Sequence, residues 1–253
     1  MPGSQVGIGL SGAGGRYFSL SALYLFIYYG FGAFSPLITQ YYNSISLTGT
    51  QIGLISAVAP VVSIIAQPMW GLFCDRFQIR KTVLILTLVV SGLVGLFFIG
   101  TSAFAFVFLL YLILSFFQSA IIPVSDSLAL GYAKKNGLQF GDIRLWGAVG
   151  FALAALVTGL LVEKLGPSVL FYSYCFALLI AVLLVLRVPD ESQETPRFRV
   201  GMLAGMRDLL RMPRYLLFLL ASFCVLGAVN ANNIWFSLFY QEIGGTVAGV
   251  GLA

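Results

Sequence analysis

Long uncharged runs alternate with short clusters of charged residues along most of the chain. Each run holds about 20 residues or more, the length an α-helix needs to cross about 30 Å of hydrocarbon. The pattern predicts six membrane spans and, after a polar linker, a seventh, at about Tyr17–Tyr42, Thr50–Phe73, Thr82–Thr101, Ala103–Ala133, Phe140–Val162, Ser168–Val188 and Tyr215–Tyr240. An eighth span begins in Gly244–Ala253. We therefore expect an all-α membrane protein.

The charged and polar segments divide this chain into four regions. Residues 1–16 are rich in glycine and serine and predict a disordered tail, and residues 17–188 form a six-span bundle. Residues 189–213 read as a cytoplasmic linker, and residues 214–253 as the first span or spans of an incomplete C-terminal bundle. Because the chain stops within this second bundle, we expect it to be a half-molecule or a truncated form that does not transport on its own.

Part of the linker is amphipathic. Five apolar residues fall on one helical face, opposite three charged ones: Met202, Leu203, Met206, Leu209 and Leu210 against Arg207, Asp208 and Arg211. That spacing suits a helix lying in the membrane interface. A tether without such a role fits the sequence equally well.

The basic residues are distributed unevenly between the two sides. With a cytoplasmic N-terminus, every Lys and Arg except Lys164 falls in or beside a cytoplasmic segment. Such an excess of positive charge on the inner side sets the orientation of membrane proteins. We therefore expect a multi-pass plasma (inner) membrane protein with its N-terminus in the cytoplasm.

Composition restricts the chemistry. Hydrophobic residues make up 59% of the chain and charged residues 9%, and the net charge of +5 belongs to the loops, where it acts as a topology signal rather than a nucleic-acid site. The chain has no histidine, and its cysteines, Cys74, Cys175 and Cys224, are isolated. We expect no metal site and no cofactor. An enzyme would need a cluster of nucleophile, base or metal ligands, which this composition does not offer.

A faint internal repeat links the two halves of the bundle. The sequence Gly-Leu-Phe-Cys-Asp-Arg-Phe at 71–77 is matched by Gly-Leu-Leu-Val-Glu-Lys-Leu at 159–165, 88 residues later. The same offset carries the first span onto the fourth and the third onto the sixth. Because the two copies end on opposite sides of the membrane, the pattern predicts an inverted three-plus-three repeat, which is typical of transporters.

The strongest local motif lies between the second and third spans. It has the order G-x-x-x-D-[RK]-x-x-x-R-K, carried by Gly71, Asp75, Arg76, Arg80 and Lys81. A positively charged loop that only sets topology is one interpretation. The order and the loop resemble the major facilitator superfamily, which implies two six-helix bundles and a gating role for this motif. The resemblance gives Asp75 a role in the conformational change rather than in substrate contact.

One acid and one base stand inside otherwise apolar sequence, at Asp126 and Arg144. A charge in a membrane segment costs at least a few kcal/mol and marks a functional candidate whose partner should be sought. A short hairpin between the fourth and fifth spans would let the two side chains meet. The pair either fixes these spans together or orients a substrate in an apolar cavity.

Three further stretches narrow the resemblance: Ala66-Gln-Pro-Met-Trp-Gly71, Pro123-Val-Ser-Asp126 and Phe140-Gly-Asp-Ile-Arg-Leu-Trp-Gly-Ala-Val-Gly-Phe151. They are similar to the oligosaccharide:proton symporters, the group of the lactose permease, and to the related phenylpropionate- and nucleoside-type permeases. The resemblance implies that Asp126 and Arg144 bind substrate, with Phe151 as the aromatic wall. Ser119 lies at a position where the lactose permease group has an amide side chain.

The chain departs from the sugar binder at several of these positions. Phe151 replaces a tryptophan, and Asp126 replaces a glutamate. In the seventh span, Asn230 and Asn233 replace two membrane-embedded aspartates. Sugar, nucleoside and aromatic acid therefore all remain candidate substrates.

Two other groups are candidates for lining the cavity. Tyr28, Phe31 and Gly32 in the first span occupy positions that line it in the permease, although an aromatic stripe also suits a lipid- or core-facing side. Asn230 and Asn233 lie on one helix face and could contact substrate or form helix–helix hydrogen bonds.

Together these features predict a secondary active transporter. The resemblance favours a proton-coupled symporter that imports a small organic solute by alternating access, with its proton-carrying residues in the C-terminal half. A drug or metabolite exporter of the same superfamily is the alternative. Exporters typically carry a Gly/Pro-rich motif in the fifth span, whereas Phe140–Val162 has no proline and carries Arg144.

Overall fold

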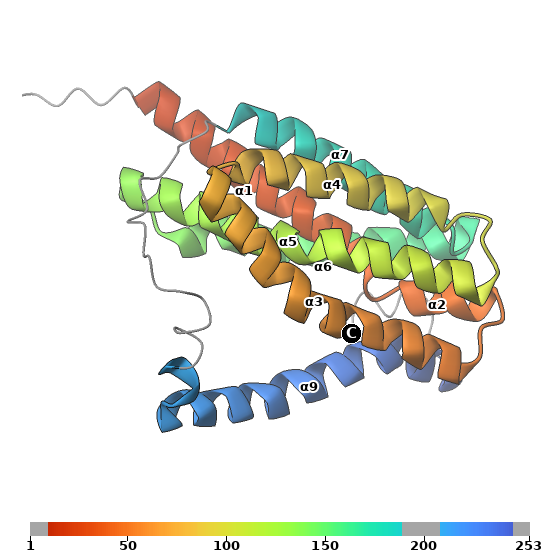
Figure 1. The fold of residues 1–253 in the computed structure, drawn as a ribbon. Coiled ribbons are helices and arrows are strands. Elements are labelled where there is room, and N and C mark those ends of the chain that lie inside the picture. The colour runs from red at the N-terminus through yellow and green to blue at the C-terminus, as the bar shows by residue number, and fades with distance from the viewer. Residues whose placement is uncertain (1–9, 189–207, 245–253) are drawn as a thin grey trace, which may run out of the picture.

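The computed structural model describes residues 10–188 and 208–244 (Figure 1). Regular structure in these residues is α-helical. The helices are α1 (Leu10–Phe34), α2 (Ile38–Ser44), α3 (Gly49–Phe77), α4 (Arg80–Phe97), α5 (Phe104–Asn136), α6 (Phe140–Leu165), α7 (Val169–Arg187) and α9 (Pro213–Glu242). Six segments of the described chain are long and apolar enough to cross a membrane, the first of them Tyr17–Ser44, and this confirms the predicted six spans.

The N-terminal boundary differs from the prediction. α1 begins at Leu10, inside the stretch expected to be a disordered tail, and residues 1–9 lie outside the described part. The stretch from Leu10 to Gly15 carries no charge and no proline. Once the apolar span has nucleated the helix, each further residue adds a hydrogen bond, and this continuation outweighs the low helix propensity of the three glycines in the stretch.

The first span is broken rather than continuous. α1 ends at Phe34 and α2 begins at Ile38, with Pro36 between them. Proline has no N–H to donate to the helix ladder and disfavours helical geometry in the residue before it. α2 is buried, and the hydroxyl of Tyr41 donates to the carbonyls of Phe98 and, at 2.9 Å, Thr101. These bonds hold α2 against the connection between α4 and α5.

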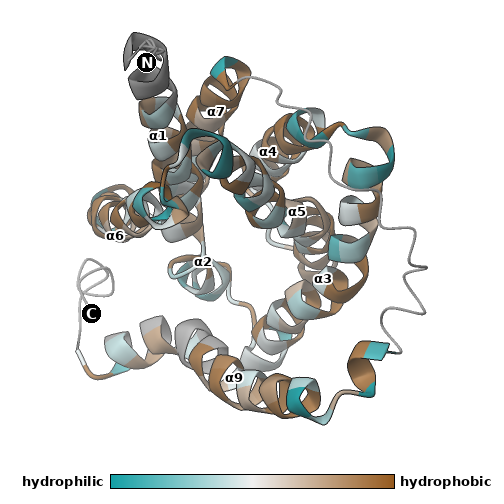
Figure 2. Ribbon diagram, turned by 90° about the vertical axis from the view of Figure 1, so that its left-hand side faces the viewer, coloured by the Kyte–Doolittle hydropathy of each residue, from teal (hydrophilic) through white to brown (hydrophobic). Residues whose placement is uncertain are grey.

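The helices pack in a pattern that follows the predicted repeat. α1 packs on α6 and α7, and α5 packs on α3 and α4 in the equivalent way. Exchanging α1 with α5, α3 with α6 and α4 with α7 leaves this set of contacts unchanged, and it also keeps the contact between α4 and α7. Figure 2 shows the six helices side by side around the bundle. The packing therefore has the symmetry of a three-plus-three inverted repeat.

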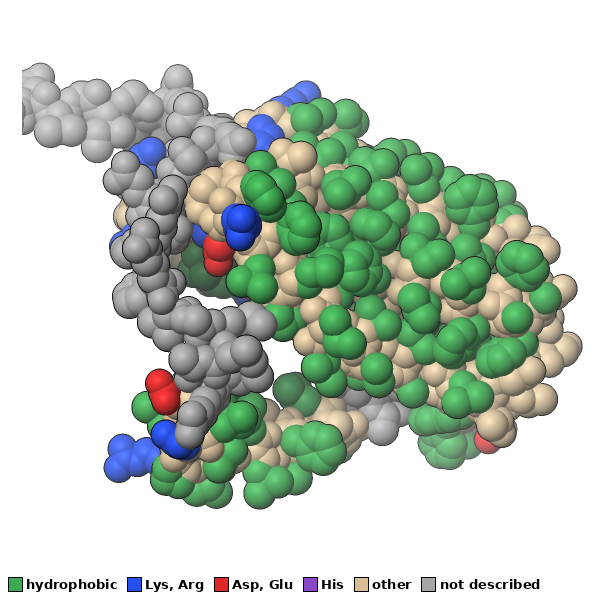
Figure 3. Space-filling model, in the orientation of Figure 1, with side chains coloured by type: hydrophobic (Ala, Val, Ile, Leu, Met, Phe, Trp, Pro, Cys, Tyr) green, Lys and Arg blue, Asp and Glu red, His purple; other side chains and the backbone are tan. Residues whose placement is uncertain are grey.

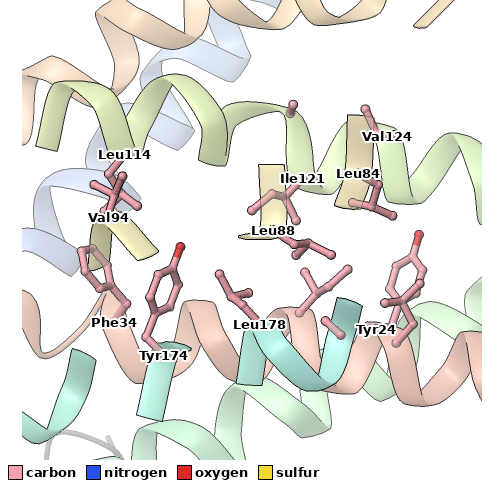
Figure 4. Close-up of a cluster of buried hydrophobic side chains, with 14 of the residues drawn as sticks. Tyr24, Phe34, Leu84, Leu88, Val94, Leu114, Ile121, Val124, Tyr174 and Leu178 are labelled. Atoms are coloured by element: carbon pink, nitrogen blue, oxygen red, sulfur yellow. The ribbon is translucent and has the colours of Figure 1, made fainter. Parts of the chain in front are cut away.

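The bundle interior is apolar, and so is much of its surface. Leu84, Leu88, Ile121 and Leu178 are at most 1% exposed and meet between α4, α5 and α7 (Figure 4). On the outside, hydrophobic side chains cover the middle of the face in Figure 3, and the basic side chains on this face gather towards the end where α1 begins. A hydrophobic belt with charges at its margin is the surface expected of a membrane protein.

α1 and α6 approach each other more closely than ordinary side chains allow. A Cβ added to Gly150 would lie 2.1 Å from the carbonyl oxygen of Leu25, and one added to Gly32 would lie 2.4 Å from that of Phe151. Small residues let membrane helices come into backbone contact. Gly32 is therefore a packing residue of the α1–α6 interface, which agrees with the core-facing alternative for this stretch.

α9, which corresponds to the predicted seventh span, lies beside the bundle and contacts α2 (Figures 1 and 2). The amphipathic segment of the linker falls mostly on residues 189–207, and the start of the eighth span on residues 245–253, both outside the described residues. α9 thus meets the bundle at α2, the second part of its first span.

Candidate functional site

The two membrane charges meet as an ion pair. The chain leaves α5 at Gly137, which takes the left-handed conformation that closes a helix, and enters α6 three residues later. This short hairpin brings Nη1 of Arg144 to 2.9 Å from Oδ2 of Asp126. The predicted contact between the fourth and fifth spans is confirmed.

A third residue, Tyr24 of α1, completes the cluster. Its hydroxyl donates a hydrogen bond of 2.7 Å to Oδ1 of Asp126, the carboxylate oxygen that Arg144 does not use. Its ring stacks on Tyr28 at 6.1 Å and meets the Phe140 ring edge-on. Nothing in the sequence marked this tyrosine among the many aromatics of the first span, because its partner lies 102 residues away. The cluster thus joins three helices, α1, α5 and α6.

Solvent exposure increases across the cluster, from Tyr24 to Asp126 to Arg144. Tyr24 is 1% exposed, while the side chains of Asp126 and Arg144 are 22% and 50% exposed. The guanidinium of Arg144 lies 5.9 Å from the centre of the Phe140 ring, within range of a cation–π contact. Only Nη1 of Arg144 is hydrogen-bonded within the described chain, so most of its N–H donors stay available. The site can therefore offer fixed donors to an acceptor group on a solute.

The aromatic candidates lie along the α1–α6 interface next to the pair. The Tyr28 ring packs on Gly147, where an added Cβ would lie 2.8 Å from it, and the centre of the Phe31 ring lies 6.4 Å from that of Tyr28. Phe151 lies further along α6, with its side chain 39% exposed. The described interactions include none between the Phe151 ring and the ion pair. The structure thus brings Tyr28 to the pair, whereas Phe151 is placed only on the same helix.

Ser119 belongs to a different part of the bundle. It lines a cavity of about 190 Å³ between α3 and α5, whose other polar lining residues include Gln67, Asp75 and Arg80. Its hydroxyl donates to the carbonyl of Phe116 in its own helix. Trp70 closes part of the same interface by donating from Nε1 to the Phe116 carbonyl at 3.0 Å. Ser119 therefore faces the loop motif rather than the Arg144 site.

The predicted gating motif forms the end of α3 and the start of α4. Nη2 of Arg80 pairs with Oδ1 of Asp75 at 3.0 Å, and the Asp75 side chain remains 69% exposed. A Cβ added to Gly71 would meet nothing within 4 Å in the described residues, so no helix packs closely on this glycine here. Arg76 extends over the ring of Phe77. In this structure, the motif carries an ion pair in which Asp75 is exposed and Arg80 is largely covered, beside a glycine with no close neighbour.

Lys81 of the motif makes a contact between helices that the sequence did not indicate. Its ammonium group donates to the carbonyls of Val188 at 2.6 Å and Leu186 at 3.2 Å, at the C-terminal end of α7. The last carbonyls of a helix lack partners within the helix, and a cation there also complements the helix dipole. Lys81 therefore fastens the start of α4 to the end of α7.

The last two candidates, Asn230 and Asn233, lie in α9. Their side chains fall outside the part of the chain that the structure describes, so their proposed contacts stay predictions.

Comparison with known proteins identifies the class to which this fold belongs. The family model described as "MFS_1 like family" matches residues 17–253. The maltose permease of Geobacillus stearothermophilus is 37% identical over 245 residues, which cover 96% of this chain and 61% of the relative. The lactose permease of Klebsiella oxytoca is 25% identical over 216 residues, covering 77% of this chain and 50% of the relative. This chain thus spans half to three fifths of the length of these relatives.

A solved structure agrees in fold. The nucleoside transporter NupG superposes with a TM-score of 0.76 at 17% identity, over 88% of this chain and 57% of that one. At this identity the likeness concerns the fold alone. The chain belongs to the MFS_1 like family, and its fold is that of the N-terminal half of a major facilitator transporter. The relatives named above are permeases and transporters rather than enzymes, and the predicted resemblance is confirmed.

Proposed function

We propose that this chain is the N-terminal half of a proton-coupled symporter that imports a small uncharged solute rich in hydroxyl groups, such as a sugar. Asp126 and Arg144 would bind the solute near the middle of the full-length transporter, and a second bundle would rock against the first. The N-terminus would lie in the cytoplasm, as the distribution of basic residues favours.

The observation that carries the proposal is the geometry of the ion pair. Asp126 compensates the charge of Arg144 at 2.9 Å, so the cluster has no net charge to balance a carboxylate. The free N–H donors of Arg144 and the remaining lone pairs of Asp126 match the acceptor and donor capacity of hydroxyl groups. An aromatic acid fits less well, because its anion would compete with Asp126 for the same guanidinium. A nucleoside, which is uncharged and carries a ribose, remains compatible.

The similarity to a protein named maltose permease points the same way. Proton coupling rests on the resemblance to the oligosaccharide:proton symporters, whose proton-carrying residues lie in the C-terminal half. An exporter is a weaker candidate, since α6 (Phe140–Leu165) contains Arg144 and no proline.

The test is an uptake panel in vesicles that contain the full-length transporter. Radiolabelled disaccharides, nucleosides and aromatic acids are offered with an inward proton gradient and after its collapse by an uncoupler. We expect accumulation of an uncharged hydroxyl-bearing solute that falls to equilibration without the gradient. Accumulation of only an organic anion would refute the solute class. Loss of preloaded solute under the inward proton gradient, with accumulation only when the gradient is directed outward, would favour an exporter.

A further inference from the structure

We infer that Tyr24 is a positioning residue of this site: its hydroxyl fixes the Asp126 carboxylate so that Arg144 keeps a free edge for the solute. The inference rests on the proposed function and adds to it a residue that neither the motif nor the comparisons assign. The role is one of positioning, because Tyr24 itself is 1% exposed and its hydroxyl is already engaged.

The argument begins with how the carboxylate is shared. Tyr24 occupies Oδ1 of Asp126 at 2.7 Å, and Arg144 occupies Oδ2 at 2.9 Å. An arginine and a carboxylate left to themselves commonly pair through two parallel hydrogen bonds, which use both oxygens and two guanidinium nitrogens. With Oδ1 held by the tyrosine, Arg144 pairs through one nitrogen. The rest of the guanidinium is left to face the exposed side of the cluster.

Tyr24 is suited to this role because its ring is held on two sides. It stacks on Tyr28 with an interplanar angle of 17° and meets Phe140 at 81°. The hydroxyl therefore has a fixed origin on α1, while its acceptor is on α5 and the paired cation is on α6. A donor held rigidly by packing is what a preorganised binding site requires. Without it, the carboxylate would be free to turn toward Arg144 and take up the donors that the solute needs.

The alternative to a positioning role is that the Tyr24–Asp126 hydrogen bond only holds α1 against α5. The two roles differ in what they predict. A tie between helices affects stability, whereas a positioning hydroxyl affects solute affinity with the fold intact.

Tyr24→Phe in the full-length transporter removes the hydroxyl and keeps the ring with its packing. Tyr42→Phe is the matched control, since its hydroxyl is buried and has no hydrogen-bond partner within the described chain. We expect Tyr24→Phe to raise the KM for the transported solute about tenfold or more, the effect of losing one hydrogen bond to a charged group, with the maximal rate and the Tm largely kept. Tyr42→Phe should leave KM unchanged. An unchanged KM in Tyr24→Phe, or a fall in Tm that accounts for the lost uptake, would overturn the inference.

The variant Arg144→Ala distinguishes a failure of the Tyr24 inference from a failure of the proposed function. If Arg144→Ala abolishes uptake while Tyr24→Phe has the KM of the unmodified protein, the site stands and the role of Tyr24 is refuted. If Arg144→Ala also transports normally, the site itself is refuted.

A second readout does not depend on transport. In the purified protein, the infrared carboxylate band that disappears in Asp126→Asn reports the hydrogen bonding of Asp126. We expect Tyr24→Phe to shift that band and Tyr42→Phe to leave it in place. A band that is identical in Tyr24→Phe and the unmodified protein would contradict the assigned hydrogen bond.

Discussion

At the residue scale, single polar groups hold the ends and the centre of an otherwise apolar bundle. Tyr24, Asp126 and Arg144 join three helices at one point, and Lys81 joins two more at the helix ends. Each of these groups has a partner, which offsets the cost of placing a polar group in apolar surroundings. We therefore expect substitutions in the Tyr24, Asp126 and Arg144 cluster to change solute binding, and substitutions of Lys81 to change stability.

Lys81 offers the residue-scale prediction. Lys81→Met should lower the free energy of unfolding by about 1 kcal/mol, because two carbonyls at the end of α7 lose their donor. Lys81→Arg, which can still donate, should recover most of the loss. Lys134→Met, at an exposed lysine in the last turn of α5, is the charge-matched control. Thermal unfolding in detergent measures all three, and equal Tm values for Lys81→Met and Lys134→Met would argue against the role of Lys81.

The ion pair could be predicted from the sequence, whereas the tyrosine could not. Asp126 and Arg144 are the rare charges of two apolar spans and flank a short connection, so only their meeting satisfies both. Tyr24 is one of many aromatic residues in its span, and the direction of its hydroxyl depends on how α1 packs on α5 and α6. That packing is set by glycine contacts between distant segments, which no local pattern reveals.

At the element scale, the closest contact in the bundle is between α1 and α6. Gly150→Ala should destabilise the protein by about 3 kcal/mol or prevent folding, because the new Cβ would lie 2.1 Å from the Leu25 carbonyl and backbone must move. Gly53→Ala in α3 is the control, since its Cβ would meet nothing within 4 Å and alanine favours the helix. The measurement is the Tm of each purified variant. Similar Tm values in the two variants would contradict the backbone contact.

The helices themselves were largely predictable, since the apolar runs are long and separated by charges. Two boundaries were not. The first span was expected to be one helix over Tyr17–Tyr42, yet Pro36 separates α1 from α2. α2 is held by hydrogen bonds from Tyr41 to carbonyls 57 and 60 residues away. The start of α1 at Leu10 was missed because glycine and serine in a terminal stretch resemble a tail, while continuation of an established helix favours order.

At the scale of the whole molecule, the six spans form one half of a major facilitator fold, and its symmetry follows from the repeat seen in the sequence. The α3–α5 interface is the symmetry mate of α1–α6 but lacks its glycine pair, since Val62 stands at the position equivalent to Gly150. The repeat thus predicted the order of packing but not how close each pair would come.

The proposed orientation predicts which loops face the cytoplasm. In a background with the native cysteines replaced by serine, Ser102→Cys lies between α4 and α5 and Gln139→Cys just before α6, both at exposed positions. A membrane-impermeant maleimide added to intact cells lacking the outer membrane should label Ser102→Cys and not Gln139→Cys. Both should be labelled after lysis. The reverse pattern would place the N-terminus outside.

The central claim is that Asp126 and Arg144 bind the solute rather than merely fasten α5 to α6. Uptake and Tm of the exchanged double variant, Asp126→Arg with Arg144→Asp, test it most directly in the full-length transporter. The exchange retains an ion pair between the two helices but moves the guanidinium away from its position on α6. We predict that the double variant regains Tm relative to Asp126→Arg alone and yet does not take up the solute. Uptake near that of the unmodified protein would show that the pair only holds the helices together.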